Sequence, residues 1–143
     1  MLAITRMSAS QEHIPFLDYI GLEIDEWRDG HAVVGLEIEP HHLNRAGVVH
    51  GGVYAVLADA AGGLAGCFSG DSNQRILAYT VSLTTNFLAS AQNGRLLATG
   101  TVMRSGRRVF FSNIDIGCSG RRVAIAQGSF MLVDRVPGEA SGK

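Results

Sequence analysis

The sequence predicts an α+β fold in which one long central helix is wrapped by a curved antiparallel β-sheet of about five to six strands. Two observations predict this arrangement. The apolar, glycine-rich run from His50 to Gly66 has the length of a helix, and the segments on both sides alternate apolar and polar residues as strands do. Because a helix that is apolar on most sides must be buried, we expect one sheet to curl around it.

The chain has 143 residues, a length that fits a single domain. We expect the core of this domain to span about residues 22–133, with a short N-terminal helix and a C-terminal tail at the periphery. The formal net charge of −1 gives no basic field, so we expect no nucleic-acid partner. The N-terminus has no apolar run behind a basic start, which indicates a cytoplasmic protein without a targeting segment.

The elements before the central helix begin with a short helical candidate at residues 11–20. Residues 22–28 and 31–39 then alternate apolar and polar side chains on either side of the dipeptide Asp29-Gly30. This dipeptide is typical of a tight turn, so the two segments predict a β-hairpin.

A loop is predicted between this hairpin and the central helix. Pro40 ends the second strand, and residues 41–50 lack any steady periodicity. Loops in this position often hold the residues of a functional site.

Candidates for metal binding are few. Cys67 and Cys118 lack the paired spacing of a metal or redox site, and we expect both thiols to be reduced. His41 and His42 are neighbours in the loop, without a cysteine or carboxylate cluster beside them, so we interpret them as solvated. We therefore expect neither a metal nor a cofactor.

The central run contains one formal charge at neutral pH, Asp59, if His50 is neutral. The stretch from Gly51 to Gly70 is long enough to cross a bilayer, but its glycines and the uncompensated Asp59 make insertion costly, so we expect no membrane span. An aspartate is seldom tolerated in such a run without a partner or a task. We interpret Asp59 as a functional carboxylate, the alternative being a carboxylate that is merely satisfied by hydroxyl groups.

Further strands follow the helix, in segments that cover residues 76–88, 95–104, 109–117 and 123–133. Their short connections predict an antiparallel meander. The sequence SGRRV occurs after two of these segments, at residues 105–109 and 119–123, which predicts two successive hairpin turns at opposite ends of the sheet.

The helix start carries a motif of fixed spacing, Asn44-x5-His50-Gly51-Gly52-x6-Asp59. It resembles the signature of the PaaI-type acyl-CoA thioesterases of the hotdog superfamily, and the resemblance covers roughly Leu22 to Val133. The resemblance implies the hotdog fold and the hydrolysis of acyl-CoA thioesters to a free carboxylic acid and CoA.

Thioester hydrolysis explains why these residue types stand together. Attack on the thioester places negative charge on the carbonyl oxygen, which a backbone N–H at a helix start can stabilise. Gly51 and Gly52 suit this position because glycine lets a ligand approach the backbone closely. Asp59 can act as the base or as the nucleophile.

The resemblance also implies individual roles. It assigns the oxyanion-binding amide to Gly51, an assisting role at the same oxygen to Asn44, and a role in holding the attacking water to Ser82. Alternatives remain for each residue: the glycine can simply permit tight helix entry, Asn44 can cap the loop, and Ser82 can be an ordinary strand hydroxyl. His50 can contact the substrate, act as a base or hold the loop.

Two groups of residues are candidates for substrate binding. Gly52 is expected to contact the substrate, and an apolar pocket lined in part by Tyr54, Leu57 and Phe87 is expected to receive the acyl group. CoA carries phosphates, so the arginines around one predicted turn are candidates to bind its nucleotide, namely Arg104, Arg107 and Arg108. A solvated turn is the alternative.

The spacing of Gly51 and Asp59 has a consequence for assembly. Eight residues on one helix separate them by about 12 Å, so both cannot touch one carbonyl group. If both are catalytic, two subunits must share each site, which predicts a homo-oligomer with antiparallel helices across a two-fold axis. The resemblance implies a dimer at minimum, commonly paired into a tetramer. Three glycines can pack at such an interface or face the sheet, namely Gly62, Gly63 and Gly66.

Two other functions fit the same fold. A hotdog enoyl-CoA hydratase or dehydratase generally needs a histidine paired with an acidic residue, and the spacing of His50-Gly51-Gly52 and Asp59 fits hydrolysis better. A non-catalytic acyl-CoA sensor is the second alternative, because a fold alone does not establish an enzyme. Asp59 argues against pure binding, since a carboxylate beside a thioester has little use without chemistry.

Overall fold

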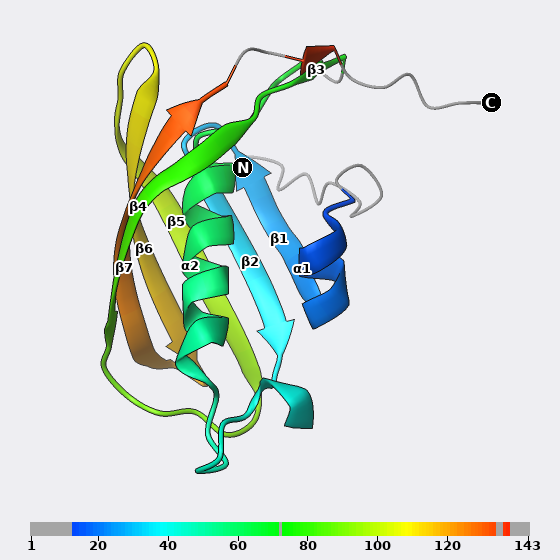
Figure 1. The fold of residues 1–143 in the computed structure, drawn as a ribbon, viewed down its shortest axis with the longest axis vertical. Coiled ribbons are helices and arrows are strands. Elements are labelled where there is room, and N and C mark those ends of the chain that lie inside the picture. Colours follow the sequence, from blue (N-terminus) through cyan, green and yellow to red (C-terminus); the bar gives the residue numbers. More distant parts are fainter. Residues whose placement is uncertain (1–12, 72, 134–135, 138–143) are drawn as a thin grey trace, which may run out of the picture.

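The computed structural model describes residues 13–71, 73–133 and 136–137 (Figure 1). Its helical elements are α1 (Pro15–Ile20), the short 3-10 helix η1 (Pro40–His42) and α2 (Gly51–Ala65). Its strands are β1 (Leu22–Arg28), β2 (His31–Glu37), β3 (Gln74–Arg75), β4 (Ala78–Phe87), β5 (Arg95–Ser105), β6 (Val109–Cys118), β7 (Arg121–Leu132) and β8 (Val136–Pro137).

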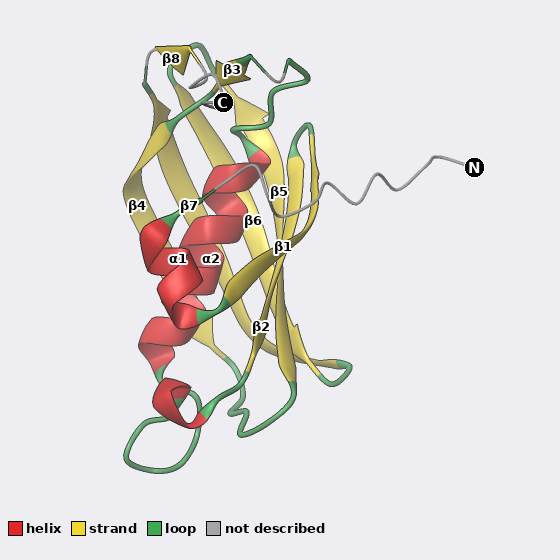
Figure 2. Ribbon diagram, turned by 90° about the vertical axis from the view of Figure 1, so that its right-hand side faces the viewer, coloured by secondary structure: helices red, strands yellow, loops and turns green. Residues whose placement is uncertain are grey.

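One antiparallel sheet of the described residues contains six strands in the order β1-β2-β5-β6-β7-β4, and β3 and β8 pair separately. The large sheet curves around α2, and Figure 2 shows α1 and α2 on the same side of it. The predicted central helix and wrapping sheet are therefore confirmed, as is the hotdog arrangement that the resemblance implies. No helix in the described part of the chain is long and apolar enough to span a bilayer.

Most predicted elements are present near their expected bounds. The β1–β2 hairpin turns at Asp29-Gly30, and Gly30 takes the positive φ of 71° that a residue with a side chain rarely adopts. The two SGRRV turns join β5 to β6 and β6 to β7 at opposite ends of the sheet, as predicted. Of the predicted N-terminal helix, residues 11 and 12 lie outside the described residues, as do residues 138–143 of the predicted tail.

The predicted meander is wrong for β4, which pairs with β7 and not with β5. Three strand spacings separate β4 from β5, about 14 Å, and the connection of residues 88–94 can extend to about 23 Å. The connection crosses the end of the sheet below α2, where the Val49 amide donates to the carbonyl of Ala91 at 2.8 Å. This crossing leaves the outer edge of β4 without a strand partner among the described residues.

The backbone of α2 lies directly against the backbone of β5. A methyl group at Gly100 would lie 2.2 Å from the carbonyl oxygen of Ala61, so only glycine permits this approach. Beside it, the buried hydroxyl of Ser112 donates a hydrogen bond to the carbonyl of Gly62 at 2.9 Å. The helix is thus seated on the sheet by main-chain contact and a buried hydrogen bond.

Gly62 and Gly66 face the sheet, whereas Gly63, the third glycine that could pack at an interface or face the sheet, is half-buried. A methyl group at Gly62 would lie 2.9 Å from the Phe130 ring, and one at Gly66 would lie 2.2 Å from the Phe110 ring. These two rings stack with their centroids 5.1 Å apart. Small helix residues therefore make room for large sheet residues in the core.

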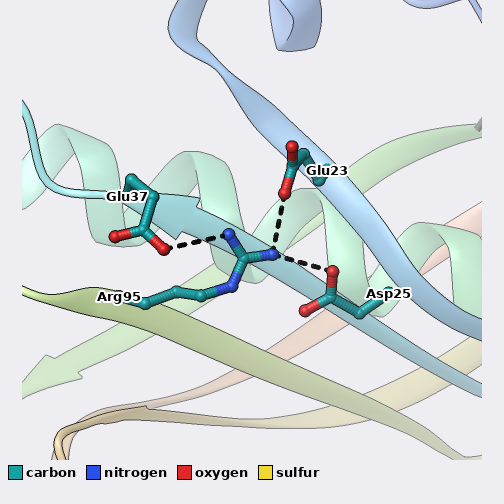
Figure 3. Close-up of polar contacts among 4 residues, drawn as sticks. All are labelled: Glu23, Asp25, Glu37 and Arg95. Atoms are coloured by element: carbon teal, nitrogen blue, oxygen red, sulfur yellow. Dashed lines mark hydrogen bonds and ion pairs between the residues drawn. The ribbon is translucent and has the colours of Figure 1, made fainter.

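An ionic cluster joins β1, β2 and β5 on the face of the sheet away from α2 (Figure 3). The guanidinium of Arg95 contacts Asp25 at 2.8 Å, Glu23 at 2.9 Å and Glu37 at 3.4 Å. The hydrogen bond to Asp25 is the largest cause of a raised pKa of Arg95. Gly35 leaves the space for this side chain, since a methyl group there would lie 2.3 Å from Nη2.

We expect Gly100→Ala to lower the free energy of unfolding by about 2 kcal/mol or more, because the obstructing atom is a backbone oxygen that cannot move aside. Gly70→Ala is the matched control, since nothing lies within 4 Å of the added methyl group, and its effect should stay within about 0.5 kcal/mol. Urea denaturation of both variants measures the difference. Equal stabilities would show that the α2–β5 contact does not require glycine.

Candidate active site

The loop before α2 is organised around Asn44. A β-bridge between Leu43 and Val49 closes the loop, and the Asn44 amide N–H donates to the carbonyl of Val48 at 2.7 Å. The side-chain Oδ1 accepts from the backbone N–H groups of Ala46 at 2.9 Å and Val48 at 3.3 Å. Because Oδ1 faces its own loop, the NH2 group of this exposed side chain is directed elsewhere and can donate to a ligand.

His42 is buried, so its predicted solvation is wrong. Only 3% of the residue is exposed, and its Nδ1 accepts from the N–H of Glu39 at 2.9 Å. Its Nε2 lies 2.8 Å from the carbonyl oxygen of Ile20, at the end of α1. Both ring nitrogens have backbone partners inside the fold, which replace the water that the prediction assumed. His41 is exposed, as predicted.

His50 caps the N-terminus of α2. Its Nδ1 accepts from the amide of Gly52 at 2.9 Å, and its carbonyl accepts from the amide of Val53 at 2.9 Å. The amide of Gly51, the first of the helix, has no hydrogen-bond partner within the described residues. The helix dipole adds positive potential at this point, so the Gly51 N–H is suited to a negatively charged oxygen.

Two aromatic side chains, Phe87 and Tyr54, lie near the start of α2. The ring of Phe87, at the end of β4, is 57% exposed and would lie 3.4 Å from a methyl group at Gly51. The ring of Tyr54 lies 6.0 Å from that of Phe87, at an angle of 48°. Tyr54 is buried, which raises the pKa of its hydroxyl, and Leu57 is fully buried in the core. Of the three predicted pocket residues, Phe87 therefore offers an exposed apolar surface.

Asp59 lies on the half-exposed side of α2 and accepts a hydrogen bond from a threonine. The hydroxyl of Thr80 donates to Oδ1 at 2.5 Å. A β-bulge between Thr80 and Ser82 shifts the pairing of β4 with β7 by one residue. Thr80 therefore lies opposite the buried Phe130. Ser82 lies opposite Ser129 and is exposed. The sequence did not indicate Thr80 as the partner of Asp59, because no glycine or proline marks this bulge.

The predicted site residues form separate groups within one chain. Asn44, His50 and Gly51 lie at the N-terminal end of α2, while Asp59 lies about 12 Å farther along the helix. The turn between β5 and β6 is at the opposite end of the molecule from Gly51 (Figure 1). It carries the three exposed arginines of the predicted nucleotide site, namely Arg104, Arg107 and Arg108.

The described residues contain no group of three or more histidine, cysteine, aspartate or glutamate side chains that could hold a metal ion. Cys67 and Cys118 are both buried and form no disulfide.

The chain is similar to a family of known proteins. A family model described as the thioesterase superfamily matches residues 46–125. The protein PA0474 of Pseudomonas aeruginosa is 37% identical over 101 residues, which are 70% of this chain and 74% of that protein. A 1,4-dihydroxy-2-naphthoyl-CoA hydrolase of Listeria monocytogenes is 33% identical over 88 residues, 62% of this chain and 70% of the hydrolase.

A solved structure has the same fold. It is a mutant of the phenylacetic acid degradation protein PaaI of Thermus thermophilus, with a TM-score of 0.74 and 27% identity. The superposition covers 82% of this chain and 98% of that one.

We expect His50→Ala to lower the free energy of unfolding by about 1 kcal/mol, because the Gly52 amide loses its side-chain acceptor. His50→Ser keeps an N-cap acceptor and should recover most of that loss. Thermal and urea unfolding measure both variants. If the alanine and serine variants are equally stable, the cap does not hold the helix start.

Proposed function

Because the chain belongs to the thioesterase superfamily, we propose that it hydrolyses acyl-CoA thioesters to a free carboxylic acid and CoA. Family membership supports thioester hydrolysis as the general activity. The finer assignment to CoA esters is supported by the relative from Listeria monocytogenes that is named a CoA thioester hydrolase. The observation that carries the proposal is the Gly51 amide, which heads α2 without a partner among the described residues.

The Gly51 amide is the proposed oxyanion donor. As the thioester carbonyl is attacked, its oxygen becomes negative, and a donor already aimed at that oxygen stabilises the transition state. The NH2 group of Asn44 lies on the same end of α2 and is the proposed second donor, since its Oδ1 is held by the loop. Phe87 lies beside this point and offers an exposed apolar surface to the acyl group.

Asp59 is the proposed base or nucleophile. A carboxylate can take a proton from the attacking water. It can also attack the carbonyl itself, which breaks the C–S bond, releases the CoA thiolate and leaves an anhydride that water then cleaves. In either case the hydroxyl of Thr80 holds Oδ1 and leaves Oδ2 for the reacting group. Ser82 keeps its role in holding the water as a prediction from the resemblance.

Two copies of the chain are proposed to complete each site. The outer edge of β4 lacks a strand partner among the described residues, and Tyr79 and Val81 on this strand are exposed. Pairing two such edges around a two-fold axis sets two α2 helices antiparallel. Gly51 of one subunit then approaches Asp59 of the other, and the symmetry gives two equal sites.

The same antiparallel pairing suits the arginine turn. It brings the end of one subunit that carries Arg104, Arg107 and Arg108 toward the Gly51 end of its neighbour. The subunit that contributes Asp59 would then also contribute guanidinium groups for the phosphates of CoA.

A panel of acyl-CoA thioesters with detection of the released thiol tests the proposal. Release of CoA at a rate that depends on the protein supports it. Hydration of an enoyl-CoA without thiol release would instead identify a hydratase, and binding of the thioester without turnover would identify a sensor.

We expect Asp59→Asn to lower kcat by at least about a hundredfold, the usual scale for loss of a base or nucleophile. Thr80→Val should lower kcat by about tenfold, because it removes one hydrogen bond to a charged group. Steady-state kinetics with the best thioester of the panel measure both variants. Ser82→Ala is the comparison variant, and a larger loss there than in Thr80→Val would transfer the supporting role from Thr80 to Ser82.

If Asn44→Ala and Asp59→Asn are each nearly inactive alone, we expect the two variants to complement one another. If Asn44 and Gly51 come from one subunit and Asp59 from the other, a mixed dimer has one site with both defects and one intact site. Random pairing makes about half of the dimers mixed, so co-refolding should restore roughly a quarter of the wild-type activity. Differently tagged subunits verify the exchange. A verified mixture that stays inactive would contradict the shared site.

A further inference from the structure

His42 connects three segments at the N-terminal end of α2. Its Nε2 lies 2.8 Å from the carbonyl oxygen of Ile20, and its Nδ1 accepts from the amide of Glu39 at 2.9 Å. Its own carbonyl oxygen accepts from the amide of His50 at 2.9 Å. One buried residue thus ties the end of α1 and the start of η1 to the residue that caps α2.

The geometry points to His42 as a positioning residue: it holds His50, and through His50 the Gly51 amide, in the orientation that hydrolysis requires. The inference rests on the proposed function, because His42 is buried behind the loop and is assigned no contact with the substrate. Its effect on the reaction passes entirely through the residues that it holds.

The two ring contacts define the state of the imidazole. A backbone N–H can only donate, so Nδ1 facing Glu39 carries no proton. A backbone carbonyl can only accept, so Nε2 facing Ile20 carries the proton. His42 therefore acts as a neutral ring with one donor and one acceptor, and neither contact can be made by an apolar side chain.

The contacts lead from His42 to the proposed oxyanion donor in two steps. The hydrogen bond from the His50 amide to the His42 carbonyl fixes the backbone of His50. His50 then accepts from the amides of Gly52 and Val53, which leaves the Gly51 amide at the helix start without a partner among the described residues. Rotation or displacement of His50 would redirect all three amides together.

The other side of the same loop is held independently of His42. The Val49 amide donates to the carbonyl of Ala91, in the connection between β4 and β5. Loss of the His42 ring removes its contacts to Ile20 and Glu39 but leaves the main-chain hydrogen bonds at Val49 and His50 in place. The loop then lacks its anchor to the end of α1, so that the helix start can shift without melting. A displacement of about 1 Å at a reacting group can cost about a hundredfold in rate.

Three substitutions at position 42 test the inference. His42→Phe keeps a ring and removes both polar contacts, whereas His42→Asn keeps an amide near the position of Nδ1 and His42→Gln keeps one near that of Nε2. His41→Asn is the matched control, because His41 is exposed and its ring lies 4.0 Å from that of His42. Arg95→Met is the control for stability, since it breaks the ionic cluster on the face of the sheet away from α2.

We expect kcat for an acyl-CoA thioester to fall by about tenfold or more in His42→Phe, with KM changed by less than about threefold. The two amide variants should lie between His42→Phe and the wild type, and His41→Asn should stay within about twofold of the wild type. Arg95→Met should lower the thermal midpoint while kcat is kept. In NMR, amide hydrogen exchange at Gly52 should become faster in His42→Phe, because its acceptor on His50 is displaced.

A folded His42→Phe variant with wild-type kcat and wild-type exchange at Gly52 would overturn the inference. So would a loss of kcat in Arg95→Met that matches the loss in His42→Phe at equal thermal midpoints. If His42→Phe does not fold, the amide variants decide, and wild-type kcat in both overturns the inference. If the wild type hydrolyses the thioester, any of these results refutes only the role of His42. If the wild type does not hydrolyse any thioester, the proposed function is refuted, and this role with it.

Discussion

The contact between the backbones of α2 and β5 is the constraint on which the rest of the structure depends. The missing side chain of Gly100 lets the helix lie against the sheet, and the Ser112 hydroxyl bonds to the carbonyl of Gly62 beside it. Toward the end of α2, the indole of Trp27 donates to the carbonyl of Leu64 at 2.7 Å. Because these contacts involve the helix backbone itself, the helix cannot rotate or slide without breaking them.

This fixed rotation of α2 decides which side chains leave the core. Gly52, Val56, Asp59 and Gly63 recur at helical spacing and lie on the side that is exposed or half-exposed. The carboxylate of Asp59 consequently stays in reach of water while it accepts a hydrogen bond from Thr80. The small neighbours of Asp59 on this side leave room for a second helix, so the packing that builds the core also prepares the surface of the proposed shared site.

Local patterns sufficed for part of this architecture. The strands of the first hairpin, the helix and the motif at its start could be predicted because periodicity and turn residues report short-range structure. The neighbour of β4 could not, because strand order depends on how the whole sheet closes around α2. Thr80 was missed because a bulge without glycine or proline reads as regular alternation. His42 was misjudged because its partner Ile20 lies far earlier in the chain, where no local signal indicates a contact.

The proposed pairing of β4 edges would make activity depend on mass action. If each site needs Gly51 from one chain and Asp59 from another, an isolated chain holds two incomplete halves and no working site. Below the dissociation constant of the dimer, the number of complete sites then falls with the square of the protein concentration. The level to which the protein accumulates, as much as the chemistry of its side chains, would set the rate at which thioester is consumed.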